Sequence, residues 1–173
     1  AKAQAKGLKI ASVHPMFGPD VDLLAGRNIL ICDTGDAQVT AKAKALFEGT
    51  TAALVVLPLE RHDQLMSYVL GLSHLSNLVF ASALAQSGVA MEELARVAST
   101  TFNAQLAVTR PVAQENQELY YEIQAENAFT PELLKSLAER LGDYTHALKA
   151  KDRAAFRRMM TASRRSEEHT SEL

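Results

Sequence analysis

Cysteine is almost absent from this sequence. Cys32 is the only cysteine in 173 residues, so no internal disulfide can form and the fold must rest on its core. A chain without structural disulfides suits a reducing compartment, and we expect a cytoplasmic protein. Because Ile29, Leu30 and Ile31 precede it, Cys32 itself is expected to be a buried strand residue rather than a nucleophile.

Neither sign of charge dominates, and long apolar runs are missing. The formal net charge is -2, and no cluster of Lys and Arg with interleaved aromatics occurs, so we expect neither nucleic acid nor an acidic membrane surface as a partner. One basic run has the helical spacing of a solvated face: Arg153, Arg157, Arg158 and Arg164. No stretch reaches the roughly 18 consecutive apolar residues of a membrane span.

A phosphate-binding glycine motif is also missing. The eight glycines never fall at the G-x-G-x-x-G spacing, and no Walker A sequence exists. The chain as given therefore contains no recognisable phosphate cradle, and residues that could bind a nucleotide are unknown. The first residue is not Met, and residues 1–6 lack the apolar core of a signal peptide. They are typical of the end of a surface helix, so we expect a longer protein to continue upstream.

The sequence changes in character near Pro58. Before it, three short β-rich runs suit buried strands: Lys9–Val13, Asn28–Cys32 and Ala52–Leu57. A helix is expected at Asp36–Phe47 between the second and third strands. This order of β, loop, β, α, β is that of the end of an α/β sheet.

After Pro58 the pattern predicts helices and no strand. The fold class is therefore α/β followed by all-α, divided at residues 1–58 and 59–164. The expected helices cover residues 60–87, 91–99, 105–115, 116–124 and 130–149, and a last helix runs through Met160. Pro111 should kink the third helix or mark its start. Thr130 is the expected N-cap of the fifth helix and Asp152 that of the last.

The final nine residues differ from the rest. Residues 165–173, RSEEHTSEL, show no apolar periodicity, and their back-translation resembles a common short-read sequencing adapter. We therefore expect the natural sequence to stop at Arg164 and residues 165–173 to be adapter read-through. His169 is for that reason no functional candidate.

His14 is the first candidate for chemistry. It follows the expected strand Lys9–Val13 and opens the segment HPMFGPD, and ligands of open α/β sheets bind beyond the carboxyl ends of the strands. Two prolines and a glycine restrict this segment, so the imidazole should be held in place. The structural alternative is a histidine that only hydrogen-bonds a turn.

The long helix carries the next candidates, His62 and His74. From Gln64 to Ser87 it has no charged residue, and its polar arc holds histidine, serine and asparagine, which suggests packing against a cleft or a partner subunit. The opposite arc is expected to be mainly core, and it holds Leu65, Val69, Leu72, Leu75 and Val79. The two histidines are twelve residues apart and point about 120° apart on an ideal helix. That spacing does not suit a shared metal ion, and we predict no metal site.

Arg110 is the third candidate, in a segment with no other charge from Thr100 to Ala113. A guanidinium is the preferred partner of a carboxylate. An exposed helix arginine without a role is the structural alternative.

These segments together resemble the prephenate/arogenate dehydrogenase family, over nearly all of residues 9–160. The resemblance rests on ordered blocks at family-like separations: ASVHPMFGPD at 11–20 with GRNILIC at 26–32, LPLERHDQLMSYVLGLSHLSN at 57–77, STTFNAQLAVTR at 99–110, and AQENQELYYEIQ at 113–124.

The resemblance implies a fold, a reaction and roles. The fold is the C-terminal part of a Rossmann-type dinucleotide-binding domain followed by a helical dimerisation domain, which implies a homodimer. The reaction is NAD- or NADP-dependent oxidative decarboxylation of prephenate to 4-hydroxyphenylpyruvate, or of arogenate to tyrosine. His14 becomes the catalytic base, and Arg110, His62 and His74 bind substrate. We expect the chain to be inactive without its nucleotide-binding part.

Two other interpretations stay open. The chain could be a helical dimerisation or regulatory fragment without catalysis, or part of another hydroxy-acid dehydrogenase that combines a Rossmann domain with helices. The upstream sequence discriminates these interpretations, because a glycine fingerprint after a first strand favours the enzyme. Prephenate and arogenate, and likewise NAD and NADP, remain alternatives at this stage.

Overall fold

The protein is described here by a computed structural model of residues 6–168, with side chains through Arg164. Of the expected read-through tail, residues 165–168 belong to the last helix, whereas residues 169–173, His169 included, lie outside the described residues. The chain divides into two compact units, Ala1–Ala128 and Phe129–Leu173, and each is described by itself.

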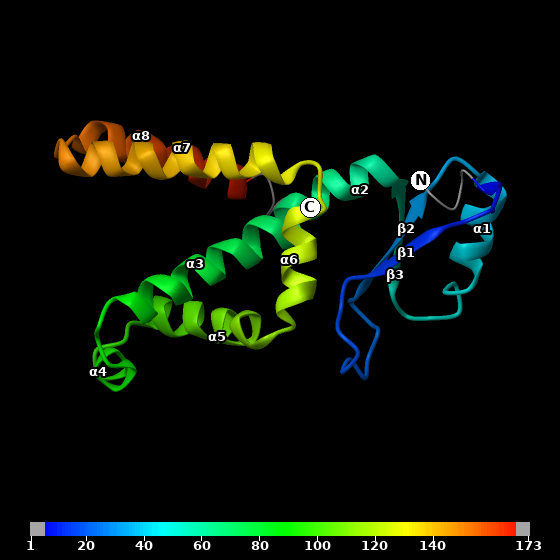
Figure 1. The fold of residues 1–173 in the computed structure, drawn as a ribbon, viewed down its shortest axis with the longest axis horizontal. Coiled ribbons are helices and arrows are strands. Elements are labelled where there is room, and N and C mark those ends of the chain that lie inside the picture. The colour runs from blue at the N-terminus through cyan, green and yellow to red at the C-terminus, as the bar shows by residue number, and fades with distance from the viewer. Residues whose placement is uncertain (1–5, 169–173) are drawn as a thin grey trace. The chain divides into compact units, whose positions relative to one another are not determined.

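The first unit opens with a three-stranded sheet in the order β1-β2-β3 (Figure 1). It consists of β1 (Ser12–Pro15), β2 (Asn28–Asp33) and β3 (Ala53–Pro58). Strand β2 runs antiparallel to β1 and parallel to β3. The expected α/β part is confirmed.

The first strand lies later in the sequence than predicted. His14 was expected after a strand at residues 9–13, but it lies within β1, opposite Leu30 of β2. Ile10 is instead held by a side chain, since the Thr34 hydroxyl donates a 2.6 Å hydrogen bond to its carbonyl. His14 is therefore fixed by the sheet ladder and not by the loop that follows it.

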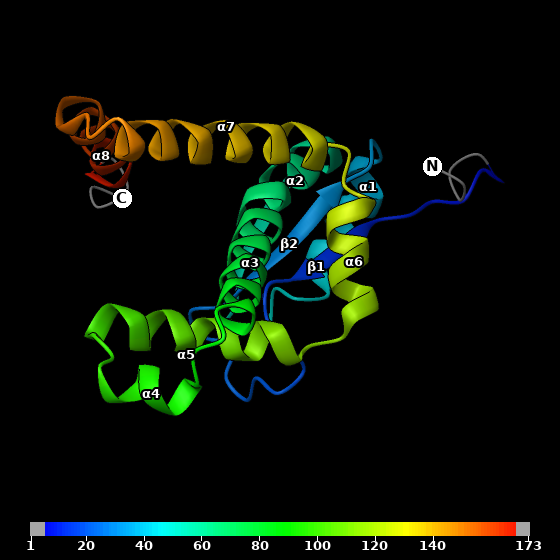
Figure 2. The same cartoon turned by 60° about the vertical axis from the view of Figure 1, so that its left-hand side comes forward.

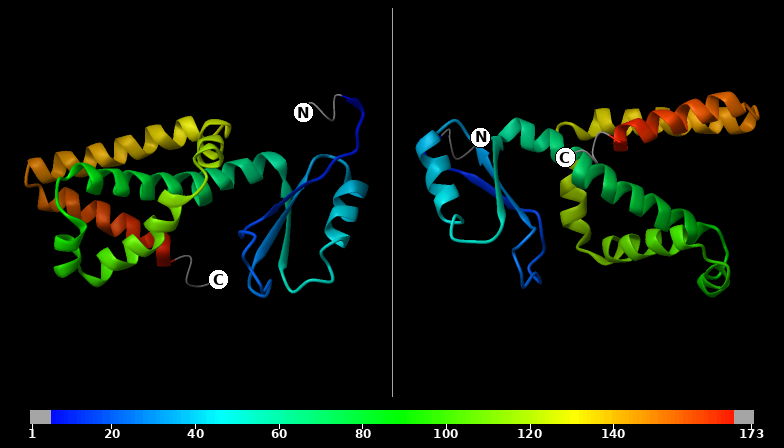
Figure 3. Two further views of the ribbon diagram at one scale, coloured as in Figure 1. Left: turned by 60° about the horizontal axis from the view of Figure 1, so that its bottom comes forward. Right: turned by 180° about the vertical axis from the view of Figure 1, so that it is seen from behind.

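A crossover helix joins the two parallel strands, as such strands require. This helix, α1 (Ala37–Ala45), lies against the sheet (Figure 3). Its N-cap is Asp36, whose carboxylate accepts hydrogen bonds from the backbone N–H groups of Gln38 and Val39. Cys32 on β2 is fully buried, as predicted, and burial raises the pKa of its thiol.

A long helical run follows β3 and contains a π-helical segment. It comprises α2 (Leu59–Met66), the π segment η2 (Ser67–Leu72) and α3 (Ser73–Gln86). The predicted helix at 60–87 is thereby confirmed, and Gly88 ends it with φ +72°. The angle expected between His62 and His74 is wrong, because a π turn holds more residues than an α turn and changes the direction of every later side chain.

The apolar arc of this run is not core within the single chain. Val69 and Val79 were expected to be buried, yet they are 51% and 56% exposed. No other described segment of the first unit covers them. Large apolar side chains left exposed along one helical run are typical of a contact surface.

The same run has the length and composition of a helix that could cross a membrane. An 18-residue stretch within Leu59–Gln86 has a mean hydropathy of 1.4, and 6% of it is buried. The sequence criterion of uninterrupted apolar residues missed it, because serine, histidine and asparagine interrupt the apolar pattern. Length and composition describe a helix that packs on another protein equally well.

Three further helices complete the first unit: α4 (Met91–Arg96), α5 (Thr100–Gln114) and α6 (Gln117–Ala125). Helix α5 begins earlier than expected, at the N-cap Ser99, so Pro111 lies inside it and does not start it. Helix α5 packs on α3, with the rings of Phe80 and Phe102 edge to face at 6.0 Å. Helix α6 then turns back toward η2 (Figure 2).

The second unit is a pair of helices, α7 (Thr130–Lys149) and α8 (Arg153–Glu168). Asp152 caps α8 as predicted, accepting from the N–H groups of Ala154 and Ala155, but the helix continues beyond Met160. The predicted N-cap role of Thr130 is wrong. Phe129 holds that position, and the Thr130 side chain is buried without a hydrogen-bond partner. No strand follows Pro58 in the described residues, which confirms the all-α second part.

Candidate functional site

Two of the predicted site residues, His14 and His62, meet directly. Nδ1 of His14 lies 2.9 Å from Nε2 of His62, and the ring centroids are 5.2 Å apart at an interplanar angle of 60°. His14 projects from β1, and His62 from α2, which continues directly from β3. The sheet therefore brings together two histidines that are 48 positions apart in sequence.

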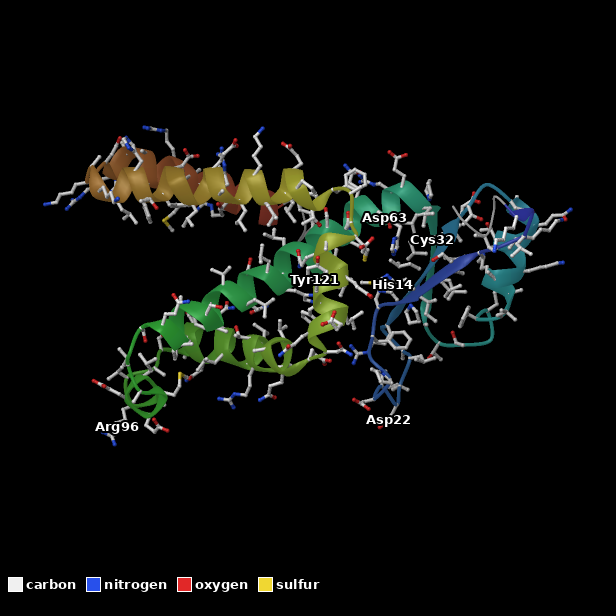
Figure 4. All side chains as sticks on the ribbon, viewed as in Figure 1. His14, Asp22, Cys32, Asp63, Arg96 and Tyr121 are labelled. Carbon is white, nitrogen blue, oxygen red and sulfur yellow. The ribbon has the colours of Figure 1, made fainter. Side chains whose placement is uncertain are left out.

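Asp63 extends this pair into a chain of three groups. Its Oδ1 lies 2.8 Å from Nδ1 of His62. The His62 side chain is only 13% exposed, whereas that of Asp63 is 49% exposed. The chain of contacts thus runs from the half-exposed Asp63 through His62 to His14 on the sheet; Figure 4 labels its two ends, Asp63 and His14.

A cavity of about 230 Å³ opens beside the histidine pair. Helix α6 forms its far wall and is fixed by two hydrogen bonds, from the Gln124 amide to the Gly71 carbonyl at 2.9 Å and from the Asn127 amide to the Asp63 carbonyl at 2.7 Å. The cavity is lined by His14, His62, Asp63, Met66, Leu70, Glu122, Ile123, Glu126 and Asn127.

Burial sets the protonation state of His14. It lowers the pKa of the imidazole below its ordinary value of 6.5, and the neighbouring His62 lowers it further. Both causes disfavour the charged form, since desolvation and a nearby like charge each destabilise imidazolium. His14 is consequently neutral near pH 7, and a neutral imidazole can accept a proton.

His74 lies in a different environment from His14. Its ring stacks on Tyr120 of α6, with centroids 4.4 Å apart and planes at 24°. Burial lowers its pKa as well, and its Nδ1 is buried without a hydrogen-bond partner. Within the described residues, His74 does not line the cavity of His14 and His62.

Arg110 is exposed on α5 and forms no ion pair within the described residues. It borders a separate cavity of about 440 Å³. The residue before it, Thr109, is 3% exposed, and its hydroxyl donates a 2.8 Å hydrogen bond to Oδ1 of Asn77 on α3. This contact fixes the turn of α5 from which Arg110 projects, but it does not bring Arg110 to His14.

Sequence reasoning missed Asp63, Glu122 and Glu126 as members of the cavity wall. Asp63 directly follows His62 in the HDQ segment, which was the available signal. The two glutamates reach the cavity only because α6 folds back, and no local pattern shows that. No group of three or more side chains that could hold a metal ion occurs among the described residues. Arg61, next to His62, donates a solvent-exposed hydrogen bond to the Gln64 side chain.

The described residues do not form a dinucleotide site. The βα turn between β2 and α1 is where a phosphate cradle would be expected. There, however, the Asp36 carboxylate already accepts from the free N–H groups of the helix, and its charge repels phosphate. This chain by itself therefore does not fit the pyrophosphate of a nicotinamide nucleotide.

Comparison with known proteins gives a consistent set of similarities. Residues 58–162 match the family described as "Prephenate dehydrogenase, dimerization domain". The chain is 25% identical, over 90% of its length, to a probable arogenate/prephenate dehydrogenase of Methanocaldococcus jannaschii. It is 28% identical, over 88% of its length, to a 4-amino-4-deoxyprephenate dehydrogenase of Streptomyces pristinaespiralis. It spans 35% and 51% of these two relatives.

Solved structures share the fold. A prephenate dehydrogenase from A. aeolicus, in complex with hydroxyphenyl propionate and NAD+, superposes with a TM-score of 0.73 at 15% identity. The match covers 96% of this chain and 61% of that one. The arogenate dehydrogenase of Synechocystis superposes with a TM-score of 0.68 at 16% identity, covering 92% of this chain and 61% of that one.

Proposed function

The chain belongs to the prephenate dehydrogenase family, and from this premise we propose that it is the proton-accepting and dimerising part of an NAD- or NADP-dependent dehydrogenase of the cytoplasm. The proposed reaction is the oxidative decarboxylation of prephenate to 4-hydroxyphenylpyruvate, or of arogenate to tyrosine. The observation that carries the proposal is the contact of His14 with His62 beside a cavity, where burial lowers the pKa of the His14 imidazole.

His14 is the proposed catalytic base. The nicotinamide cofactor, when bound, takes up hydride from the ring carbon that bears the 4-hydroxyl. That hydroxyl becomes more acidic as the carbon is oxidised, so a neutral imidazole nearby can take its proton. The lowered pKa of His14 keeps the ring in the accepting form over most of the neutral range.

Of the three residues predicted to bind substrate, Arg110 and His74 are proposed to do so, whereas both ring nitrogens of His62 are bonded to His14 and Asp63. Arg110 offers an exposed guanidinium without an ion pair in the described residues, and such a fork suits a ring or side-chain carboxylate. His74 has an unpartnered, buried Nδ1, which can donate to or accept from a ligand. Neither Arg110 nor His74 lines the cavity of His14 in the single chain. In the proposed enzyme, a second copy of the chain completes the site.

The proposed partner is a second copy of the chain. The matched family description names dimerisation, and the exposed apolar face of the α2–η2–α3 run, which includes Tyr68, Val69 and Val79, would be covered in a dimer. Burying such side chains contributes roughly 25 cal/mol per Å² of apolar surface. No nucleic acid or membrane partner is part of this proposal.

The dinucleotide would be held by residues outside this chain. The curated relatives are two to three times as long as the part matched, since the chain spans 35% to 51% of them. NAD is the better supported nucleotide, because a structural neighbour was solved with NAD+. The chain alone is accordingly expected to be inactive. Activity is expected of the whole protein, in which the chain is joined to a nucleotide-binding part.

The test is an assay of the whole protein with three substrates, prephenate, arogenate and 4-amino-4-deoxyprephenate, each with NAD and with NADP. We expect reduced nucleotide and carbon dioxide in equal amounts with prephenate or arogenate. Turnover of the amino compound alone would assign the chain to the chemistry named for its Streptomyces relative. No turnover with any of the three would overturn the proposed function.

A further inference from the structure

We propose that Asp63, acting through His62, holds His14 in the single tautomer that leaves its Nε2 free as the base. His62 and Asp63 are then positioning residues. This inference rests on the proposed function for its kinetic consequence, but the tautomer that it assigns is a property of the protein alone.

The hydrogen-bond chain permits one arrangement of protons when both rings are neutral. A carboxylate oxygen only accepts, so the 2.8 Å contact with Asp63 requires the hydrogen of His62 to be on Nδ1. Nε2 of His62 then carries a lone pair and accepts from Nδ1–H of His14 across 2.9 Å. The hydrogen of His14 is used in that contact, and its Nε2 is left with a lone pair.

This arrangement also stabilises the ring after proton uptake. In the reaction the O–H bond of the substrate breaks and an N–H bond forms at Nε2 of His14, which leaves that ring as imidazolium. Its Nδ1–H already points at the lone pair of His62, and the negative charge of Asp63 lies behind His62. The hydrogen bonds to the charged ring are therefore stronger than those to the neutral ring. The proton returns to water from Nε2 after the product leaves.

The surroundings favour a positioning role for His62 over direct contact with substrate. Only 13% of its side chain is exposed, and both ring nitrogens are occupied by His14 and Asp63. The Asn127 amide holds the backbone carbonyl of Asp63 at 2.7 Å, which fixes the start of the chain of hydrogen bonds.

Other titratable groups near the rings do not replace Asp63. Glu122 of α6 and Glu126, the residue that ends this helix, line the same cavity, but within the described residues neither is hydrogen-bonded to the two imidazoles. Cys32 lies on β2, where burial is the main cause that raises the pKa of its thiol and keeps the group uncharged. Asp63 is thus the one carboxylate in the described residues that bonds either ring.

The experiment is nitrogen NMR of the whole protein labelled with ¹⁵N-histidine, combined with kinetics of two variants. In the unsubstituted protein, under conditions where both rings are neutral, we expect His14 and His62 each to carry hydrogen on Nδ1. Asp63→Asn removes the charge with little change in shape, so the neutral rings should become tautomer mixtures. The matched control is Asp143→Asn, because Asp143 is similarly exposed and also pairs with a neighbour, Arg140, on α7.

The kinetic readout separates positioning from general destabilisation. Asp63→Asn should lower kcat by about 10-fold or more, with KM within roughly 2-fold, because proton transfer as a whole contributes about 10² to 10⁴. The acid limb of its pH profile should move to lower pH, since imidazolium loses a favourable charge. Asp63→Glu should restore part of kcat, and Asp143→Asn should match the parent protein.

The NMR and kinetic results distinguish a wrong tautomer assignment from a wrong proposed function. Hydrogen on Nε2 of neutral His62 in the unsubstituted protein would overturn the inference even if Asp63→Asn did not fold. Unchanged tautomers and an unchanged acid limb in a folded Asp63→Asn variant would overturn it and leave the proposed function standing. Absence of turnover in the unsubstituted protein would overturn the proposed function, while the NMR spectrum would still decide the tautomer.

Discussion

His14 on β1 and His62 on α2 approach within 2.9 Å, Nδ1 to Nε2. This contact joins the strand part of the chain to the start of the helical part. The matched family region begins at residue 58, so the proposed base and the residue that holds it come from opposite sides of that boundary. The position of the base thus depends on the direction that α2 takes after β3, because this direction places His62 against His14.

The pH dependence of the whole protein follows from the lowered pKa of His14. A base must be neutral to accept a proton, and burial and the neighbouring His62 lower the pKa below 6.5. Activity should therefore be full at neutral pH and fall as the pH drops through a value below 6.5. The measurement is log kcat/KM against pH, with a substrate whose own groups do not titrate there. An acid limb of log kcat/KM with its midpoint above pH 6.5 would contradict the lowered pKa of His14.

Arg110→Ala should mainly weaken substrate binding. Hydrogen bonds to charged groups contribute about 1.5 to 3 kcal/mol, so KM should rise by about 10-fold or more, with a smaller change in kcat. The matched control is Arg157→Ala, which removes an exposed arginine from α8 and should leave KM as it was. An unchanged KM for Arg110→Ala would remove this arginine from the site.

Val79→Glu should weaken the proposed dimer. Val79 is 56% exposed on α3 in the single chain, and a carboxylate buried in an apolar contact is strongly unfavourable. Sedimentation at several concentrations should show a dimer for the parent protein and a shift toward monomer for the variant. Leu46→Glu, at a 79% exposed position after α1, serves as the control. A parent protein that sediments as a monomer would contradict the account of the exposed helix face.

His74→Phe should make the protein less sensitive to acid. Burial lowers the pKa of folded His74 below its unfolded value, so the unfolded chain binds more protons and stability falls as the pH drops below about 6.5. Phenylalanine keeps the stack on Tyr120 without a titrating group. The drop in Tm between pH 7 and pH 5 should therefore be smaller in the variant. An equal drop in both proteins would assign the acid sensitivity to other groups.

Local patterns predicted the elements of the fold well. The strand at 28–32, the crossover helix and the caps Asp36 and Asp152 follow from apolar runs and from short side chains that accept from helix N–H groups. Thr130 has the same local signal as a cap, but its side chain is buried and the preceding residue holds the cap position. Burial by neighbouring segments is what a local pattern does not contain.

The site was less predictable than the fold, for a related reason. His14 and His62 were singled out by position and by family resemblance, yet their contact depends on β1 pairing three residues later than expected. The π segment between His62 and His74 changes the direction of His74, and no feature of SYVLGL marks that segment in advance. Asp63, adjacent to His62, matters only through the hydrogen bond that the folded chain allows.

The central claim is that His14 is the proton acceptor, and His14→Asn in the whole protein tests it most directly. Asparagine keeps a similar polarity but cannot take up the proton, so kcat should fall by about 10²-fold or more, and the acid limb of the pH profile should disappear while nucleotide binding is unchanged. His146→Asn on α7 controls for loss of a histidine. A His14→Asn variant that keeps both the parental kcat and the parental acid limb would contradict the account.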